Sequence, residues 1–408
     1  MGAANEPGVV IVGAGQAGSE LATSLRTQGH AGGIVVVGDE RWLPYRRPPL
    51  SKTFLAGDAA PESLEIKPAA LYAKLDIEVQ TGVGVETIDR EARSVRLYDG
   101  RALPYSTLVL ATGGHARRLA IAGADRPNVH GIRGIDDVLR LRADFVPGRR
   151  LVVVGGGYIG LETAAVAVQH GLSVTVVEAA PRVLPRVASP ALSQFYLDLH
   201  RERGVDVRLG LGVHAFEGAE RVETVVLADG SRIDADLVVV GIGIVPNTEL
   251  AETAGLEVAD GIVVDSATRT SDPAILAIGD CSHHHNARYD RRMRLESVPN
   301  AMEQARVAAA LICGKPAEYR AVPWFWSDQY ELKLQMVGLA EGHDRIVLRG
   351  DMGERAFVQF HLRDGVVVAA DAVNRPQEFA LARRMVTEGA RPDPQKLGDP
   401  AMALKDLV

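Results

Sequence analysis

Cysteine, aromatic residues and long apolar runs are scarce in this sequence. It has two cysteines, Cys281 and Cys313, in 408 residues, a usage that fits a reducing cytoplasm better than a disulfide-bonded secreted protein. No run of 18 apolar residues occurs, which argues against a membrane span. The first residues have neither the basic nor the apolar region of a secretion signal. We therefore expect a cytoplasmic protein that does not span a membrane.

Positive charge is in the minority. The net charge is −7 at pH 7, which argues against nucleic acid as the main partner. Hydrophobic residues make up 47% of the chain and charged residues 24%, the proportions of a soluble globular protein. A length of 408 residues exceeds what one hydrophobic core usually spans, so two or three domains are expected.

A glycine-rich turn follows a short apolar strand in the middle of the chain. Gly155, Gly157 and Gly160 have G-x-G-x-x-G spacing, a helical segment follows them, and a second apolar strand ends at Glu178. In dinucleotide-binding units one such glycine makes the tight turn, one lets the backbone approach a pyrophosphate, and one packs helix on strand. The helix N-terminus also attracts phosphate. The segment therefore predicts a nucleotide site.

The same pattern occurs near the start of the chain. Gly13, Gly15 and Gly18 follow an apolar strand, and Asp39 ends the next one. One copy alone would be a weak signal, because glycine-rich turns also occur in proteins that bind no nucleotide. Two copies, each with its strand, helix and acid, are far stronger.

The repeat extends beyond these glycines. In each half an Asp-Gly turn is followed by an apolar strand that ends in glycine: Asp99–Gly100 leads to Gly113, and Asp229–Gly230 leads to Gly243. Asp-Gly pairs between apolar runs are typical of β-hairpins. Self-similarity of this length predicts two related domains, and hence two bound nucleotides.

The position of the cysteines excludes some chemistry. Flavoenzymes that reduce disulfides need a cysteine pair after the first unit, so that a thiolate can attack the flavin, and no cysteine precedes Cys281. The same absence excludes a peroxidase-type single cysteine near the first helix, and Cys281 is expected to be a buried small residue. His283–His285 are successive residues, which rarely converge on one ion, so no metal site is expected.

Three further segments carry groups suited to a ligand. An apolar strand that ends at Gly279–Asp280 puts a carboxylate at the carboxyl edge of a sheet, where α/β proteins bind ligands. A helix from Pro299 to about Cys313 follows, and its N-terminus would stabilise a reduced, anionic flavin. The loop of residues 45–52 carries three cations, which face either solvent or a ligand phosphate or a buried acid.

From Pro323 the composition changes. Aromatic residues are 5% of the chain but gather here, with Trp324 and Trp326 close together, and a helix is expected from Pro376 to Gly389. These features predict a small α+β domain. The alternative to a ligand-binding role for the two tryptophans is packing in a core or between domains.

Together these segments resemble the FAD-dependent ferredoxin reductases of the putidaredoxin reductase type, which serve haem monooxygenases and Rieske ring-hydroxylating oxygenases. The matching segments span the whole chain and are Val9–Gly18, Arg47–Lys52, Leu108–Gly114, Leu151–Glu162, Ala277–Asp280, Glu296–Asn300 and Pro323–Tyr330. The resemblance implies an α/β fold with two Rossmann-like domains in a glutathione-reductase-like arrangement and a small α+β C-terminal domain. It implies an FAD-binding domain of residues 1–114 and 246–322, an NAD-binding domain of residues 115–245, and a third domain of residues 323–408.

The resemblance also implies site residues. The FAD contacts would be Gly13, Gly15, Ala17, Gly18, Asp39, Lys52, Val85, Ala111, Arg133, Asp280 and Val298. The NAD contacts would be Gly155, Gly157, Tyr158, Ile159, Gly160, Glu178 and Gly243. Lys52 and Glu162 would pair close to the flavin, where a lysine suits an incoming hydride, and Trp326 would lie beside the flavin ring.

Glu178 is expected to choose the reductant. A carboxylate at the end of this strand accepts hydrogen bonds from a ribose diol and repels a 2′-phosphate, so NADH is expected rather than NADPH. In the alternative interpretation Glu178 only caps its strand. The nearby cation Arg182 is an argument against the NADH assignment.

These features predict an NADH:ferredoxin oxidoreductase. A hydride passes from NADH to FAD N5, and the flavin gives its electrons singly to a [2Fe–2S] ferredoxin. Ferredoxins of this family are acidic, so docking requires a local basic patch. Its candidates, for each of which ordinary solvated surface is the alternative, are Arg288, Arg291, Arg292, Arg294, Arg306, Lys333, Arg383 and Arg384. Two other functions stay open: a reductase for rubredoxin or oxygen, and a redox sensor or interaction protein similar to apoptosis-inducing factor.

Overall fold

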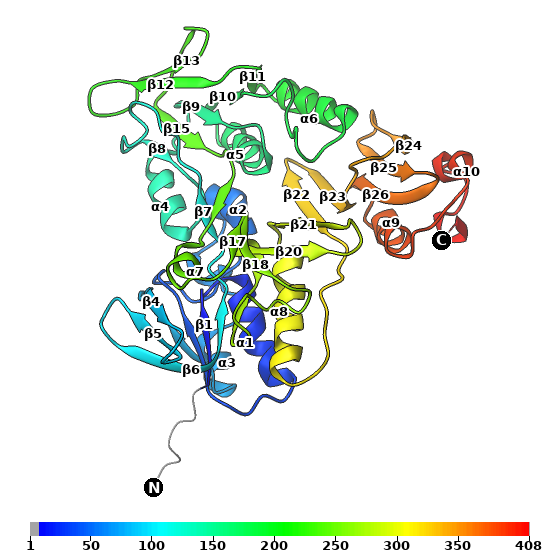
Figure 1. The fold of residues 1–408 in the computed structure, drawn as a ribbon. Coiled ribbons are helices and arrows are strands. Elements are labelled where there is room, and N and C mark those ends of the chain that lie inside the picture. Colours follow the sequence, from blue (N-terminus) through cyan, green and yellow to red (C-terminus); the bar gives the residue numbers. More distant parts are fainter. Residues whose placement is uncertain (1–7, 408) are drawn as a thin grey trace.

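A computed structural model describes residues 8–407 of the chain. Its N-terminal part is built on a parallel sheet in the order β3-β2-β1-β6, with β19 on the far side of β6 (Figure 1). The strands are β1 (Gly8–Val12), β2 (Ile34–Val37), β3 (Glu78–Gln80), β6 (Ala102–Leu110) and β19 (Ile275–Ala277). Helices α1 (Gln16–Thr27) and α8 (Val298–Ile312) lie side by side against this sheet, and α3 (Ala69–Lys74) precedes β3.

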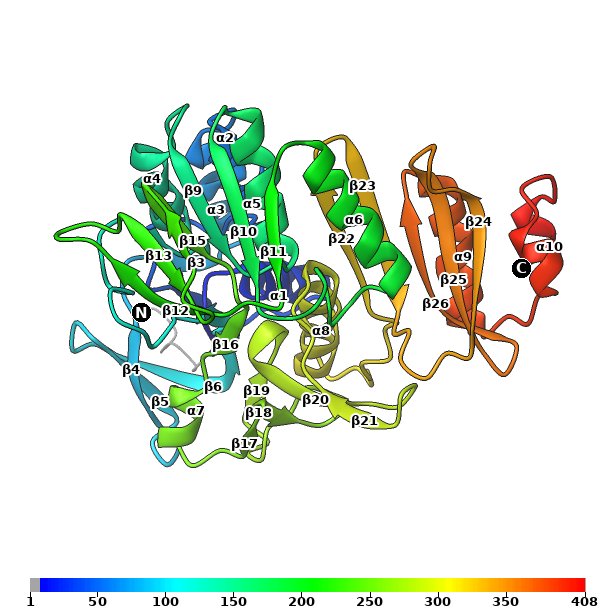
Figure 2. The ribbon, with the colours of Figure 1, turned by 90° about the horizontal axis from the view of Figure 1, so that it is seen from above.

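A second parallel sheet repeats the first in the order β11-β10-β9-β15-β8. Figure 2 shows its strands β11, β10, β9 and β15 from above. Its strands are β8 (Val129–His130), β9 (Arg150–Val154), β10 (Ser173–Glu178), β11 (Asp206–Leu209) and β15 (Leu237–Val240). The helices of this part are α4 (Ile135–Asp144), α5 (Tyr158–Gln169) and α6 (Pro190–Glu202). Each sheet therefore contains the strand–glycine turn–helix–strand unit that the sequence predicts, as β1-α1-β2 and β9-α5-β10.

Both predicted Asp-Gly turns are present. Asp99–Gly100 joins β5 (Ser94–Leu97) to β6, and β4 (Val85–Asp89) completes this antiparallel extension. Asp229–Gly230 joins β13 (Thr224–Leu227) to β14 (Arg232–Asp234), beside β12 (Val213–Glu217). Gly100 and Gly230 have φ of +86° and +84°, the left-handed conformation that favours glycine at such turns.

The chain passes between the two parallel sheets twice, on paired strands. These are β7 (Gly114–Ala116) and β16 (Ile244–Pro246), which are antiparallel partners. After α7 (Glu249–Thr253) a four-stranded sheet follows, made of β17 (Val258–Ala259), β18 (Gly261–Val264), β20 (Ser282–Asn286) and β21 (Arg291–Met293). A 3-10 turn at Gly279–Cys281 joins β19 to β20, and it carries Asp280.

The C-terminal part is a five-stranded antiparallel sheet in the order β22-β23-β26-β25-β24 (Figure 1). Its strands are β22 (Trp324–Gln329), β23 (Leu332–Gly338), β24 (Arg345–Asp351), β25 (Ala356–Arg363) and β26 (Val366–Val373). The expected helix is α9 (Pro376–Glu388), which ends at Gly389 with φ of +68°, and α10 (Pro394–Gly398) and a 3-10 turn at Leu404–Leu407 follow. Two parallel sheets and this antiparallel sheet with its helices confirm the predicted fold class.

The loop of residues 45–52 is more ordered than expected. It contains a 3-10 turn at Pro48–Ser51 and leads directly into α2 (Thr53–Ala56); a second 3-10 turn lies at Pro61–Leu64. Prolines are tolerated at the first positions of such a turn, because their missing N–H would have no intrahelical partner there.

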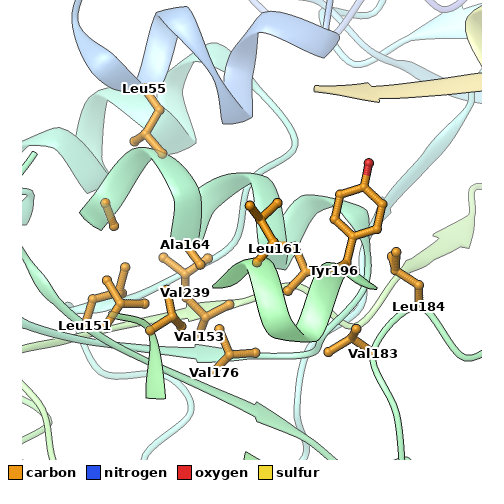
Figure 3. Packing of buried hydrophobic residues seen from close by; sticks show 14 of the residues in the cluster. Leu55, Leu151, Val153, Leu161, Ala164, Val176, Val183, Leu184, Tyr196 and Val239 are labelled. Atoms are coloured by element: carbon orange, nitrogen blue, oxygen red, sulfur yellow. The ribbon is translucent and has the colours of Figure 1, made fainter. Parts of the chain in front are cut away.

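Helix α5 is the common packing element of the molecule. It is apolar almost all round, a pattern typical of a helix buried on every side. Figure 3 shows Leu161 and Ala164 of α5 facing Val153 of β9, with Leu55 of α2 and Tyr196 of α6 close by. The same hydrophobic cluster includes residues of β22's partner strand β23. Among residues 8–407 no helix is both long and apolar enough to cross a membrane.

Candidate functional site

The first and third glycines of the two fingerprints have the same constrained geometry. Gly13 and Gly155 have φ of +117° and +108°, which a side chain would strain. A Cβ added at Gly18 would lie 2.1 Å from the Gly13 carbonyl oxygen, and one at Gly160 would lie 2.0 Å from that of Gly155. These four positions therefore shape the turn and let the helix pack closely against its strand.

The second glycine of each fingerprint is different, because it borders empty space. A Cβ added at Gly15 or Gly157 would meet nothing within 4 Å. Each glycine is also the N-cap of its helix, α1 or α5, and neither helix has an acidic residue in its first turn. Free backbone space beside an unneutralised helix N-terminus is what a pyrophosphate requires, so both units fit a dinucleotide.

A cavity of about 500 Å³ extends from the first fingerprint toward α5 and β22. It brings together residues from both units and from the C-terminal sheet. The expected site residues that line it are Gly13, Gly15, Ala17, Asp39, Lys52, Ala111, Arg133, Ile159, Glu162, Asp280, Val298 and Trp326. The N-terminus of α8, capped by Ser297, also opens on it, as expected for the helix that begins near Pro299.

Other expected site residues lie outside this lining. Gly18 is packed beneath the turn, and Val85 is 7% exposed within a core cluster. The remaining ones belong to the second unit, where they surround its own turn and the end of its second strand: Gly155, Gly157, Tyr158, Gly160, Glu178 and Gly243. Of the second fingerprint, Ile159 reaches the shared cavity.

Lys52 and Glu162 form an ion pair at the wall of the cavity. Lys52 Nζ lies 2.7 Å from Glu162 Oε2, and it also donates to the carbonyl oxygen of Pro48 at 3.2 Å. Glu162 is only 2% exposed, and the hydroxyls of Ser51 and Ser327 donate to its two oxygens at 2.6 and 2.7 Å. Burying a carboxylate is costly unless it is paired and hydrogen-bonded, as this one is.

A second ion pair joins Arg133 to Asp280, with 3.2 Å between Nη2 and Oδ2. The Arg133 Nε–H also donates to the carbonyl oxygen of Gly114 at 2.8 Å, at the first crossing between the parallel sheets. Both members line the cavity. The pair therefore ties the second unit to the turn after β19 beside the first fingerprint.

The sequence did not identify several lining residues. The carboxylate of Glu40 pairs with the guanidinium of Arg47 at 2.6 Å and accepts a hydrogen bond from the Tyr45 hydroxyl at 2.5 Å. One of the loop cations therefore contacts an acid rather than solvent. Thr112 donates to the carbonyl oxygen of Asn247 at 2.7 Å, across the two crossing strands. Glu40 directly follows the expected site residue Asp39, which is the one signal that would have suggested it.

Glu178 and Arg182 face different parts of the second unit. Glu178 accepts hydrogen bonds from the N–H groups of Gly156 and Ala180, both at 2.7 Å. Arg182 donates to the carbonyl oxygens of Pro185 and Ala188, both at 2.7 Å, and to Ser193 Oγ at 2.6 Å. The guanidinium of Arg182 is therefore engaged by its own loop and by the first turn of α6.

Aromatic side chains run from the cavity into the C-terminal part. Trp326 and Phe325 both line the cavity. The ring centroid of Trp326 is 5.6 Å from that of Trp324, and the guanidinium of Arg383 lies 5.3 Å above the Trp324 ring. Phe325, which the sequence did not indicate as a site residue, also packs against Tyr158 with 4.6 Å between ring centroids.

The histidine run and Cys281 have structural surroundings. His284 is buried edge-on against Tyr319, and burial, with the neighbouring histidines and Arg292, lowers its pKa to about 4. His285 is exposed and lies 3.2 Å from Asp290. Cys281 is buried as expected, and burial raises the pKa of its thiol. Among the described residues no group of three or more His, Cys, Asp or Glu side chains is arranged to hold a metal ion.

Comparison with known proteins agrees with this geometry. Residues 7–305 match the family model described as pyridine nucleotide-disulphide oxidoreductase, and residues 324–408 match the reductase C-terminal model. The chain is 48% identical over 406 residues to putidaredoxin reductase of Pseudomonas putida, covering 98% of this chain and 96% of that protein. It is 45% identical over 403 residues to a ferredoxin–NAD(P)+ reductase of a Sphingomonas species, covering 98% and 97%.

A solved structure is similar over nearly the whole chain. It is the reductase of a covalent putidaredoxin reductase–putidaredoxin complex, 47% identical, with a TM-score of 0.95 and coverage of 99% of this chain and 98% of that one. The predicted family and the two predicted cofactors, FAD and NAD(H), are thereby confirmed. The chain belongs to the pyridine nucleotide-disulphide oxidoreductase family and, within it, to the FAD-dependent ferredoxin reductases of the putidaredoxin reductase type.

Proposed function

We propose that this enzyme passes electrons from NADH, through FAD, to a [2Fe–2S] ferredoxin that supplies an oxygenase. The observation that carries the proposal is the buried Lys52–Glu162 pair, which joins the two nucleotide-binding units at the wall of one cavity. The similar proteins support it, since two of them are named as putidaredoxin reductase and as a ferredoxin–NAD(P)+ reductase. The solved complex with putidaredoxin supports a ferredoxin as the acceptor.

The proposed division of labour follows the two fingerprints. Residues 1–114 and 246–322 would hold FAD, residues 115–245 would hold NADH, and residues 323–408 would cover the cavity with Trp326. In the FAD part, the lining residues around Gly15 would receive the pyrophosphate and Asp39 the adenosine ribose. In the NADH part, Gly157 and Glu178 would take the corresponding roles.

The chain's own residues position charge rather than act as nucleophiles. When bound, FAD accepts a hydride and releases two electrons one at a time. Lys52 lies at the cavity wall, where its ammonium would offset negative charge that develops when FAD is reduced. Glu162 fixes this ammonium through a 2.7 Å contact, and Ser51 and Ser327 fix Glu162. Trp326 lines the same cavity.

The preference for NADH rests on Glu178. Its carboxylate would accept hydrogen bonds from the two ribose hydroxyls and repel a 2′-phosphate. The contacts of Arg182 support this choice, because the guanidinium is engaged by Pro185, Ala188 and Ser193. A phosphate at the ribose would therefore meet a carboxylate, and the engaged guanidinium of Arg182 would not compensate its charge.

The basic candidates for ferredoxin docking differ in their surroundings. Four of them form ion pairs with acids of this chain: Arg291, Arg294, Arg306 and Arg384. Arg288 and Arg292 donate to carbonyl oxygens of the chain. Lys333 and Arg383 have no carboxylate within 4 Å among residues 8–407. Since Arg383 also covers Trp324, next to the cavity, the docking surface is best centred on Arg383 and Trp324.

The test is an anaerobic titration of the yellow protein with NADH, then with NADPH, followed by an oxidised [2Fe–2S] ferredoxin. We expect NADH to bleach the flavin rapidly and ferredoxin to lose its iron–sulfur colour afterwards. The second step should slow steeply as salt increases, because docking is electrostatic. Bleaching without ferredoxin reduction would point to another acceptor such as rubredoxin or oxygen. Ferredoxin reduction that is independent of salt would contradict the basic docking surface.

A further inference from the structure

A chain of hydrogen bonds leads from Glu162 into the C-terminal sheet and on to α6. Glu162 Oε2 contacts Lys52, whereas Oε1 accepts from Ser327 Oγ at 2.7 Å. Ser327 Oγ in turn lies 3.2 Å from Gln329 Nε2, and Gln329 Oε1 lies 2.9 Å from His200 Nε2. The chain ends where Tyr330 Oη meets His200 Nδ1 at 3.1 Å. It therefore connects the ion pair at the cavity with helix α6 of the second unit.

The middle of this chain is inaccessible to water. Ser327, Gln329 and His200 are each at most 1% exposed. Ser327 and Gln329 are two residues apart on β22, so their side chains lie on the same face of the strand, and His200 lies in the last turn of α6. Buried polar groups without partners are costly, so all three side chains are constrained to bond as a set.

The far end of the chain is held in an unusual conformation. Tyr330 has φ of +55° at the turn between β22 and β23, a region that non-glycine residues rarely adopt. Arg203, the C-cap of α6, lies 5.1 Å above the Tyr330 ring and pairs with Glu331 at 2.6 Å. These contacts fix the tip of the hairpin on α6 and aim the Tyr330 hydroxyl at His200.

One arrangement of protons satisfies every link. The Glu162 carboxylate only accepts, so Ser327 donates to it, and the Ser327 oxygen is then free to accept from the Gln329 amide N–H. The Gln329 oxygen only accepts, so His200 carries its proton on Nε2. His200 Nδ1 is therefore an acceptor, and the Tyr330 hydroxyl donates to it. Every donor in the series points toward Glu162.

The opposite orientation of the Gln329 amide is disfavoured. Its oxygen would then face Ser327, and the Ser327 proton would turn toward it. Glu162 Oε1 would lose its donor inside a buried site, where an unsatisfied charged group is costly. A neutral His200 agrees with the favoured order, since burial lowers the pKa of its imidazole to about 4, partly offset by the Gln329 hydrogen bond.

We propose that Ser327, Gln329 and His200 are positioning residues that hold Glu162, and through it Lys52, in a single orientation for electron transfer. This inference rests on the proposed function, because Lys52 is assigned there to the cavity in which FAD is reduced. None of the three residues lines that cavity. They act through Glu162. The Lys52–Glu162 pair is therefore ordered only when the β22–β23 hairpin and α6 are correctly folded against each other.

The functional test removes the donor to Glu162 and then restores it. We expect Ser327→Ala to slow flavin reduction by NADH about tenfold, the size of effect typical for a lost hydrogen bond to a charged group. The flavin midpoint potential should fall as well, because a less fixed Lys52 stabilises the reduced state less. Ser327→Thr keeps the hydroxyl and should recover both quantities. Equal values in Ser327→Ala and the wild type would overturn the proposal.

Gln359 offers a matched control. It is 2% exposed, lies on β25 of the same sheet, and accepts from Ser189 of the second unit at 2.8 Å. Its hydrogen bond therefore links the same two parts of the molecule without touching Glu162. Gln359→Leu should leave the midpoint potential unchanged. A shift equal to that of Ser327→Ala would mean that general loosening of the contact, rather than Glu162, explains the effect.

A second readout needs no activity. In the FAD-loaded protein labelled with ¹⁵N-histidine, the long-range ¹H–¹⁵N signals of His200, assigned by their loss in His200→Asn, report the tautomer. We expect a neutral imidazole with the proton on Nε2 at pH 7. In Gln329→Leu both tautomers should appear, because Tyr330 can either donate or accept. A proton on Nδ1 in the wild type, or an unchanged signal in Gln329→Leu, would contradict the proton order.

The two levels of failure are distinguishable. If wild-type flavin were not reduced by NADH, the proposed function would fail before any variant was compared. If the wild type were reduced normally and the Ser327 and Gln329 variants matched it, the enzyme assignment would stand and only the positioning role would be wrong.

Discussion

The two nucleotide-binding units share one turn but handle their acids differently. Asp39, two residues after β2, is exposed, and within residues 8–407 it accepts a hydrogen bond only from the N–H of its neighbour Glu40, at 3.0 Å. Glu178 stands level with Gly38, one position before Asp39, because Val177 pairs with Val154 as Val37 pairs with Val12. It is half-buried and accepts from Gly156 and Ala180. The same fingerprint therefore supports one open acid and one acid held against the turn.

The two acids stand one register position apart, and this accounts for the difference. The middle residue of the first turn is Ala14, whose Cβ fills the space opposite Gly38: a Cβ added at Gly38 would lie 2.5 Å from it. In the second turn the equivalent residue is Gly156, and the Glu178 side chain occupies the space, with its Cβ 3.2 Å from where a Gly156 Cβ would stand. In each unit a glycine therefore faces a side chain across the turn: Gly38 faces Ala14, and Gly156 faces Glu178.

The largest expected effect comes from substituting the second glycine of each fingerprint, which should block a different nucleotide in each unit. Gly15→Val and Gly157→Val put a side chain into empty space, so the fold should survive while a pyrophosphate is blocked. Gly15→Val should be purified without flavin colour. Gly157→Val should stay yellow but lose reduction by NADH. Absorbance spectra and NADH titrations measure both, and a yellow Gly15→Val protein would refute the FAD assignment of the first unit.

Local patterns explain why so much of the fold could be predicted. Both fingerprints, both Asp-Gly turns, and the helices α8 and α9 are encoded within short segments by glycine, proline and apolar periodicity. The fifth strand of each parallel sheet was not predictable in this way. The first sheet takes β19 from a later segment, whereas the second takes β8 from an earlier one, and no local pattern reports which distant segment pairs with an edge.

The site was predictable to the extent that the resemblance named its residues. Lys52 and Glu162 were expected to pair, and the structure brings them to 2.7 Å, but their supports Ser51 and Ser327 were missed. Ser327 lies far along the chain and meets Glu162 only because α5 packs against β22. Side-chain direction is equally invisible in sequence: the Arg182 guanidinium turns into its own loop, and Val85 turns into a core.

The next largest effect is expected when the Lys52–Glu162 contact between the two units is removed. Lys52→Met removes the ammonium that pairs with Glu162 and should slow flavin reduction about 100-fold, the scale seen when a preorganised donor at a reacting centre is lost. FAD should still be bound, because the fingerprint is intact. Arg46→Met, in the same loop and bonded to Ser63 instead, is the control and should react normally. Stopped-flow measurement of flavin bleaching distinguishes them, and an equally slow control would attribute the effect to the loop as a whole.

An effect of intermediate size is the pH dependence of folding stability, to which one buried histidine from each nucleotide-binding unit should contribute. Burial lowers the pKa of His284 on β20 and of His200 on α6 to about 4, below the ordinary 6.5. Because a depressed histidine pKa favours the folded state only while the imidazole is neutral, stability should fall as pH drops from 6.5 toward 4. The loss is about 3 kcal/mol for each histidine at pH 4.

Thermal unfolding between pH 7 and pH 4 measures this loss. His284→Asn and His200→Asn should each flatten the pH dependence while lowering the melting temperature at pH 7. If either variant kept the full wild-type pH dependence, that histidine would not be the group that takes up a proton on acid unfolding.

The smallest effect is expected when the acid of each unit, Glu178 or Asp39, is replaced by alanine. Glu178→Ala should weaken NADH binding about tenfold, since two hydrogen bonds to a ribose diol are lost. Binding of NADPH should improve little, because Arg182 stays bonded to Pro185, Ala188 and Ser193. Asp39→Ala should leave NADH binding unchanged and loosen FAD instead. Titrations with both nucleotides and measurements of FAD retention separate these outcomes. A large gain in NADPH affinity would mean that a cation of this loop, Arg182 or the exposed Arg186, meets a 2′-phosphate, and the second unit would then owe its selectivity to Glu178 alone.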